Sequence, residues 1–185
     1  MTSTVTDSST PRLEVFSDFQ CPGCKGVHDV LEPVLRQAID SGLVRVEFRT
    51  MTFLDAANSQ IGSSNLRSST RAAVAAACAD FNGVYYDFYG AIYDNQPERE
   101  GDGYSDSLLR DQIPATLGLS GDALTSFQAC YDNQSTGRFV RDVDEAADKD
   151  NSDGTPRLWL NGQDITEEVL TAANPANTLK QLLGL

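Results

Sequence analysis

The chain has 185 residues, of which 40% are apolar, so one domain of ordinary size with a large insertion can bury a packed core. Its net charge of −13 argues against a nucleic-acid partner, because phosphate backbones attract basic surfaces. No stretch approaches the ~18 consecutive apolar residues that a membrane-spanning helix needs.

The first ten residues are polar and lack the apolar run of a signal peptide. We therefore expect residues 1–10 to form a flexible lead-in. An export signal or a membrane anchor, if the native protein carries one, would belong to a segment absent from this chain.

The next segment reads as strand, helix and strand. Residues 12–17 (RLEVFS) predict a buried strand, and after Cys21 the apolar residues recur at helical spacing until Ser41 and Gly42. Residues 43–48 (LVRVEF) alternate and predict a second strand, an order that favours a parallel sheet. The apolar residues expected on the inner face of this helix are Val27, Val30, Leu31, Val34, Leu35 and Ala38.

The middle of the chain is predicted to be helical throughout, over roughly residues 60–149. Two helices are expected within 65–94, a third within 106–117, a fourth capped by Ser120, and a last one over 138–149. On the last helix, the residues expected to face inward are Phe139, Val140, Val143 and Ala147.

The chain then returns to strand. Residues 156–160 (PRLWL) run into Asn161-Gly162, a dipeptide typical of a tight hairpin whose two turn residues need positive φ. Residues 166–172 and 176–184 predict two closing helical segments.

Cys21 and Cys24 form a CPGC motif at the predicted junction of strand and helix. Disulfide exchange needs a thiolate, and the free N–H groups at a helix N-terminus stabilise negative charge. Pro22 suits the first turn, where its missing N–H costs nothing. Cys21 is therefore the expected attacking thiol, and Cys24, one turn inside, the expected resolving thiol.

A lone CxxC motif has other interpretations: half of a zinc site, or a static disulfide. Zinc held by Cys21, Cys24 and His28 would still need a fourth ligand. His28, the only histidine, lies one turn after Cys24 and is expected to be a helix-surface residue, with modulation of the cysteines or metal binding as alternatives. We expect no metal and no cofactor.

The strand that ends in FSDFQCPGC, the long helical insert and the later GTPRLWLNG together resemble the DsbA-like branch of the thioredoxin superfamily. The chain is most similar to the extracytoplasmic DsbA/MdbA-type proteins of Gram-positive bacteria. The resemblance covers residues 11–185 and depends on the combination of CPGC with GTP at this separation.

This resemblance implies an α/β thioredoxin fold, a central mixed sheet flanked by helices, interrupted by an all-helical insertion domain. After the lead-in, residues 11–59 would form the first part of the thioredoxin domain, 60–149 the helical insertion and 150–185 the second part. It also implies a cis peptide at Thr155-Pro156 that faces the cysteine pair, where backbone pairs with an extended substrate.

The site residues carried over are Cys21 as nucleophile and Cys24 as resolving thiol. Pro22 and Gly23 would tune the potential, and Thr155 and Pro156 would line the substrate groove. The chain departs from the best-known members, which have His between the cysteines, so we expect a weaker oxidant.

Two further departures concern neighbouring positions. Relatives often carry a buried acid where this chain has Val15, and Glu14 is expected to face the other side of the strand. Thr155 before the cis-proline also occurs in isomerases and reductases, so it leaves the direction of the reaction open.

Cys78 and Cys130 fall in two helices of the predicted insert. The even number of cysteines fits two pairs, and we predict a structural disulfide here, worth up to ~4 kcal/mol by loop-closure entropy. Such a bridge needs an oxidising compartment. The alternative is two buried free cysteines that act as small apolar residues.

The expected function is disulfide formation in unfolded or reduced exported proteins, in the cell envelope or outside the cell. The expected regenerating partner is a membrane quinone-linked enzyme of the DsbB or VKOR kind, and the expected state is monomeric. A reductase or isomerase on the same fold is the first alternative. A peptide-binding module whose Cys21–Cys24 disulfide stays closed is the second.

Overall fold

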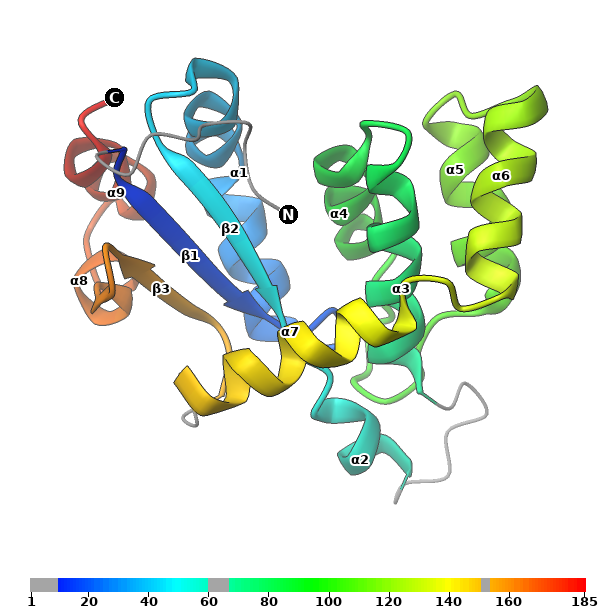
Figure 1. Ribbon diagram of the computed structural model, residues 1–185. Helices are drawn as coiled ribbons and strands as arrows, with labels where there is room; N and C mark the ends of the chain where they lie inside the picture. The colour runs from blue at the N-terminus through cyan, green and yellow to red at the C-terminus, as the bar shows by residue number, and fades with distance from the viewer. Residues whose placement is uncertain (1–9, 60–66, 151–153) are drawn as a thin grey trace.

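A computed structural model describes residues 10–59, 67–150 and 154–185 (Figure 1). The predicted lead-in, apart from Thr10, and the predicted domain boundary at residue 60 lie outside the described residues. Within the described ranges, no helix is both long and apolar enough to cross a membrane.

The sheet has four strands in the order β2-β1-β3-β4. They are β1 (Arg12–Ser17), β2 (Arg45–Thr50), β3 (Arg157–Leu160) and β4 (Gln163–Asp164). The pair β1–β2 is parallel, whereas β3 runs antiparallel to both of its neighbours. This mixed sheet confirms the predicted α/β thioredoxin fold.

Helix α1 (Pro22–Ser41) connects the two parallel strands and ends at Gly42. Gly42 adopts φ 65° and its N–H donates to the carbonyl of Ile39, which closes the last turn. Strand β2 begins two residues later than the alternation predicted, at Arg45, whose N–H donates to the carbonyl of Pro11.

The two faces of the sheet are covered by different helices (Figure 1). Leu13 and Val15 of β1 belong to the main core together with Leu31 and Leu35 of α1. Phe16 points the other way and packs in a small cluster with Ala147 of helix α7 (Gly137–Asp150) and Met51, against Trp159. Alternation along β1 therefore separates a face toward α1 from a face toward α7.

Within the described residues, the chain between β2 and β3 forms helices, turns and loops and no strand, which agrees with the predicted all-helical insert. The elements of this stretch before α7 are α2 (Leu54–Ser59), α3 (Ser68–Asp80), α4 (Tyr85–Asp94), the π-helical turn η1 (Leu108–Gln112), α5 (Ile113–Thr116) and α6 (Gly121–Asp132). Figure 1 shows α3 to α6 gathered beside the sheet, while α7 crosses back in front of it.

A disulfide between Cys78 and Cys130 joins α3 to α6. The two Cα atoms are 5.9 Å apart, and both side chains are buried. The predicted pairing is confirmed, and the alternative of two free buried thiols is wrong. The bridge closes a loop of 52 residues and lies wholly within the insertion.

The chain closes with a hairpin and two helices. Asn161 and Gly162 connect β3 to β4 with φ of 53° and 82°, as the dipeptide predicts for a two-residue turn. Helices α8 (Thr166–Leu170) and α9 (Pro175–Leu183) follow, and α9 packs against α1.

Three details of the sequence interpretation are wrong. Val30 is 48% exposed, because the buried face of α1 runs through Leu31 and Leu35, one helical step away. Phe139 is 46% exposed, one step from the buried Val140. Ser120 stands at the N-cap of α6, but its side chain makes no capping hydrogen bond.

Candidate active site

Cys21 occupies the N-cap position of α1, at the end of the turn that follows β1. Its Sγ accepts a hydrogen bond from the backbone N–H of Cys24 at 3.3 Å, and its own N–H donates to the carbonyl of Asp18 at 3.0 Å. Pro22 is the first helical residue, and because proline has no backbone N–H, this position leaves no donor without a partner. The side chain of Cys21 is partly exposed, whereas that of Cys24 is buried.

The two thiols differ strongly in acidity. Hydrogen bonding from the Cys24 thiol, followed by the Cys24 backbone N–H, lowers the pKa of Cys21 to about 6. Burial raises the pKa of Cys24 far above its usual range, and the negative charge on Cys21 raises it further. Cys21 and Cys24 are not joined in a disulfide here, so the structure represents the reduced form of the pair.

The loop before β3 lies against this pair. The Thr155–Pro156 peptide bond is cis, and the Cys21 thiol contacts the carbonyl oxygen of Thr155 at 3.8 Å. A Cβ atom on Gly23 would lie 3.4 Å from Cδ of Pro156, so the CPGC turn and the proline ring are in direct contact. The hydroxyl of Thr155 is buried and is one of the groups that lower the pKa of Cys21.

Asp18, three residues before Cys21, is a site residue that the sequence interpretation missed. Its buried carboxylate accepts from the N–H of Gln20 at 2.9 Å, from the N–H of Leu54 at 3.2 Å and from the hydroxyl of Ser69 at 2.6 Å. Burial raises its pKa to about 7, despite these donors. Asp18 thus fastens the turn that bears Cys21 to α2 and α3.

The insertion also holds the backbone of this turn, a second feature that the sequence did not reveal. The side-chain amide of Gln96 donates to the carbonyls of Phe19 and Cys21 at 2.8 and 3.1 Å. The hydroxyl of Tyr104 donates to the Phe19 carbonyl at 2.6 Å. The segment of residues 95–104, between α4 and η1, therefore contributes two donors that orient the N-terminus of α1.

His28 contradicts the expectation of a helix-surface residue. It is only 7% exposed, and its ring stacks on Tyr93 at a centroid distance of 5.4 Å. Gly90 makes room for it, since a Cβ atom there would lie 3.3 Å from Nε2 of His28. The prediction failed because α4 packs on this side of α1, and burial by α4 lowers the pKa of His28.

Glu14 and Val15 lie on opposite faces of β1. Val15 packs in the main core, whereas the buried carboxylate of Glu14 accepts from Nε and Nη2 of Arg49 at 3.1 and 2.7 Å and pairs with Arg12 at 2.9 Å. Arg12 and Arg49 therefore neutralise the charge of Glu14 on the face of the sheet away from α1.

Across the described ranges, no group of three or more His, Cys, Asp or Glu residues is placed to hold a metal ion.

Comparison with known proteins agrees with this geometry. The family model described as Thioredoxin matches residues 6–181. A search of curated proteins finds no match.

Several solved structures share the fold. The MdbA thiol-disulfide oxidoreductase of Corynebacterium diphtheriae is 19% identical, with a TM-score of 0.70 over 96% of this chain and 85% of that chain. MdbA of Actinomyces oris is 15% identical, with a TM-score of 0.75 over 97% and 82%. Reduced DsbA of Mycobacterium tuberculosis is 20% identical, with a TM-score of 0.65 over 98% and 95%.

The family match spans nearly the whole chain, including the CPGC turn and the loop with Thr155 and Pro156. The chain belongs to the thioredoxin family, and it has the fold of the DsbA- and MdbA-type structures, helical insertion included.

Proposed function

We propose that this protein is a thiol–disulfide oxidoreductase that forms disulfide bonds in exported proteins through Cys21 and Cys24. The observation that carries the proposal is the asymmetry of the pair: Cys21 is accessible with a pKa of about 6, and Cys24 is buried with a raised pKa. Only the first thiol is suited to exchange with a substrate, and only the second is protected from it.

The reaction begins from the oxidised pair. A substrate thiolate attacks Sγ of Cys21, a mixed disulfide forms, and the Cys21–Cys24 bond breaks with release of Cys24, which takes up a proton because its pKa is high. A second substrate thiolate then attacks the substrate sulfur of the mixed disulfide. Cys21 leaves as a thiolate, and the substrate has lost two electrons and two protons in all.

The electrostatics of Cys21 favour this direction. Hydrogen bonds that stabilise the Cys21 thiolate lower the free energy of the dithiol form relative to the disulfide form, which makes the pair more oxidising. The absence of a histidine between the cysteines removes one such donor, so we expect a potential below that of DsbA at ≈ −120 mV.

The substrate groove of this proposal is the surface beside Thr155 and Pro156. Cys21 lies within 3.8 Å of the Thr155 carbonyl, so an extended peptide that pairs with this backbone would carry its sulfur to Cys21. Pro22 and Gly23 would tune the potential. The division into a thioredoxin domain (11–59 and 150–185) and an insertion domain (60–149) remains part of the proposal.

Substrates, partner and compartment follow from the chemistry. A two-electron cycle needs a reoxidant, and we propose a membrane quinone-linked enzyme of the DsbB or VKOR kind. The Cys78–Cys130 disulfide supports an oxidising compartment outside the cytoplasm, where the protein acts on unfolded or reduced exported chains as a monomer.

The test is the reduction potential of the Cys21–Cys24 pair, measured by equilibration with glutathione. An oxidase requires a value between ≈ −120 mV, as for DsbA, and about −200 mV. A value near the ≈ −270 mV of thioredoxin would assign the chain to the reductases instead.

A second assay separates an enzyme from a peptide-binding module. Refolding of reduced ribonuclease should accelerate with the oxidised protein and should lose that acceleration with Cys21→Ala. If the wild-type protein and Cys21→Ala behave alike, the cysteine pair does not act and the protein only binds peptides. Faster recovery of scrambled ribonuclease than of reduced ribonuclease would favour an isomerase.

A further inference from the structure

Arginine side chains in this acidic protein are almost all paired. Of the eleven arginines, eight form ion pairs with carboxylates, and Arg157 also has a partner. The guanidinium groups of Arg67 and Arg141 form no ion pair or hydrogen bond with any residue that the structure describes. With 27 acidic side chains in the chain, two arginines left without a carboxylate are unexpected.

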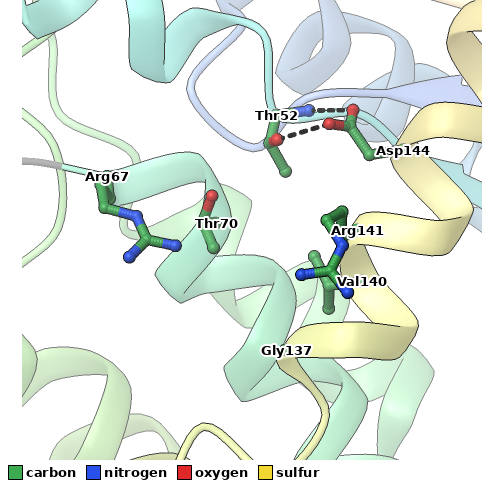
Figure 2. A pocket seen from close by; sticks show the side chains of 7 residues that line it. All are labelled: Thr52, Arg67, Thr70, Gly137, Val140, Arg141 and Asp144. Atoms are coloured by element: carbon green, nitrogen blue, oxygen red, sulfur yellow. Dashed lines mark hydrogen bonds between the residues drawn. The ribbon is translucent and has the colours of Figure 1, made fainter.

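Both of these arginines line the same pocket, which has a volume of about 140 Å³ (Figure 2). A cavity volume of roughly 10–15 Å³ is enough to hold one water molecule, so this pocket has room for a small polyatomic ion. Figure 2 shows the two guanidinium groups on either side of Thr70, with Gly137 below them. The walls come from the start of α3, the β2–α2 connection and α7.

The two hydroxyl groups of the pocket already donate their protons to carboxylates. The hydroxyl of Thr70 donates to Asp55 at 2.6 Å, and the hydroxyl of Thr52 donates to Asp144 at 2.8 Å. Asp144, the one carboxylate in the lining, also accepts from the N–H of Thr52 at 2.8 Å. The side chains therefore offer many N–H donors from two arginines and only lone pairs from the hydroxyls and the carboxylate.

We propose that this pocket binds a small tetrahedral oxyanion that keeps one proton, of which hydrogenphosphate is the example. Its unprotonated oxygens would accept from Arg67 and Arg141, which match the geometry of phosphate. Its one O–H would donate to a lone pair of Thr70, Thr52 or Asp144. Sulfate fits less well because it has no proton at neutral pH and would face these lone pairs with oxygen.

The position of the pocket gives the ligand a structural consequence. Arg67 precedes α3 and Arg141 belongs to α7, so a bound oxyanion would join these two helices beside Thr52, which follows the end of β2. Gly137, the first residue of α7, also faces the pocket, and the positive end of that helix adds to the attraction. Binding of this kind stabilises the folded state by mass action.

Calorimetric titration with inorganic phosphate tests the proposal, with sulfate at the same ionic strength beside it. The variants are Arg67→Gln and Arg141→Gln, and the matched control is Arg138→Gln, an exposed arginine of α7 outside the pocket. We expect saturable binding of phosphate by the wild-type protein and the control. Each pocket variant should bind at least tenfold more weakly, and sulfate should bind more weakly than phosphate.

Thermal unfolding gives a second readout. Phosphate and sulfate stabilise most folded proteins even when no binding site is present, because they are excluded from the protein surface. The informative quantity is therefore the difference in Tm shift between the wild-type protein and the variant. At a phosphate concentration of roughly ten times the wild-type Kd, wild-type Tm should rise by about 2–4 °C more than that of Arg141→Gln. In chloride, the two should unfold alike, because the guanidinium group of Arg141 has no other partner to lose.

An anionic lipid headgroup also carries a phosphate group that could bind the two arginines. Binding of the protein to vesicles that contain phosphatidylglycerol is therefore compared with its binding of free phosphate. A phosphodiester has no O–H, so the proposal predicts no vesicle binding that depends on Arg141. Such binding without binding of free phosphate would overturn the proposal. So would a phosphate titration with no saturation, or equal phosphate affinities for Arg141→Gln and Arg138→Gln.

Discussion

The two cysteine pairs of this protein, Cys78–Cys130 and Cys21–Cys24, differ in their position within helices and in their exposure to solvent. Cys78 and Cys130 lie inside α3 and α6, are buried, and are joined in a disulfide. Cys21 and Cys24 lie at the first turn of α1, where Cys21 is partly exposed and both thiols are free. The difference lies in where each sulfur stands relative to a helix and to solvent.

A helix interior has no free N–H groups to offer a thiolate, whereas a helix N-terminus has several. The thiol of Cys24 and, after it, the N–H of Cys24 donate hydrogen bonds to Sγ of Cys21, and they lower the pKa of Cys21 to about 6. The Cys78–Cys130 bridge closes a loop of 52 residues and joins residues within two helices. One pair is therefore suited to exchange and the other to hold the insertion together.

The sharpest test of this contrast is the loss of one cysteine from each pair. Cys21→Ala should reduce the rate of disulfide exchange by at least about 1000-fold, because the attacked sulfur is gone. Cys130→Ala should leave the rate within about threefold at a temperature where the variant is folded. The measurement is oxidation of a model dithiol peptide, and equal losses in both variants would contradict the division of roles.

Removal of the structural bridge should act on stability instead. The double variant Cys78→Ala/Cys130→Ala should lose about 4 kcal/mol of unfolding free energy, or roughly 8–16 °C in Tm, since the unfolded chain regains the entropy of an open loop. Urea unfolding monitored by circular dichroism gives the value. A loss well below 1 kcal/mol would mean that the bridge contributes little to the fold.

A smaller effect is expected at Asp18, which ties the Cys21 turn to the insertion. Asp18→Asn leaves the Leu54 N–H without its acceptor and should cost about 1–3 kcal/mol. Burial raises the pKa of Asp18 to about 7, so its contribution to wild-type stability is largest below pH 4 and is lost as the pH rises through 7. The variant lacks this dependence, so its deficit should shrink between pH 5 and pH 8.

Urea unfolding of both proteins at the two pH values measures that change. The control is Asp29→Asn, which removes an exposed carboxylate from α1. A deficit for Asp18→Asn that grows with pH would show that the Asp18 charge stabilises the turn.

The smallest effect is expected at Thr155. Its buried hydroxyl lies near Cys21 and contributes to the lowered pKa of that thiol. Thr155→Val keeps the shape and removes the hydroxyl, so the pKa of Cys21 should rise. The rate at which the reduced protein attacks a model disulfide at neutral pH should then fall about two- to threefold, in proportion to the Cys21 thiolate fraction. An unchanged pH–rate profile would remove Thr155 from the list of groups that stabilise the thiolate.

Local patterns predicted much of this molecule. The strand over 12–17, the helix that starts after Cys21 and the Asn161-Gly162 hairpin each depend on residues close in sequence, and each is present. The family resemblance supplied what local patterns do not contain, namely the fold and the approach of Thr155 and Pro156 to the cysteines.

The errors and omissions arise where distant segments meet. His28 is buried because α4 covers it, and nothing near residue 28 encodes that contact. Asp18 and Gln96 act on the Cys21 turn through partners 36 to 77 residues away in the chain. Such contacts follow from the packing of the insertion against the sheet, which periodicity alone does not determine.

The central claim is that the start of α1 holds the sulfur of Cys21 as an anion. Titration of the reduced protein, followed by the ultraviolet absorbance of the thiolate, measures this directly, with Cys21→Ala as the blank. The account predicts one transition with a pKa of about 6 that is absent from the variant. A transition near the ordinary cysteine value of ≈ 8.5 would contradict it.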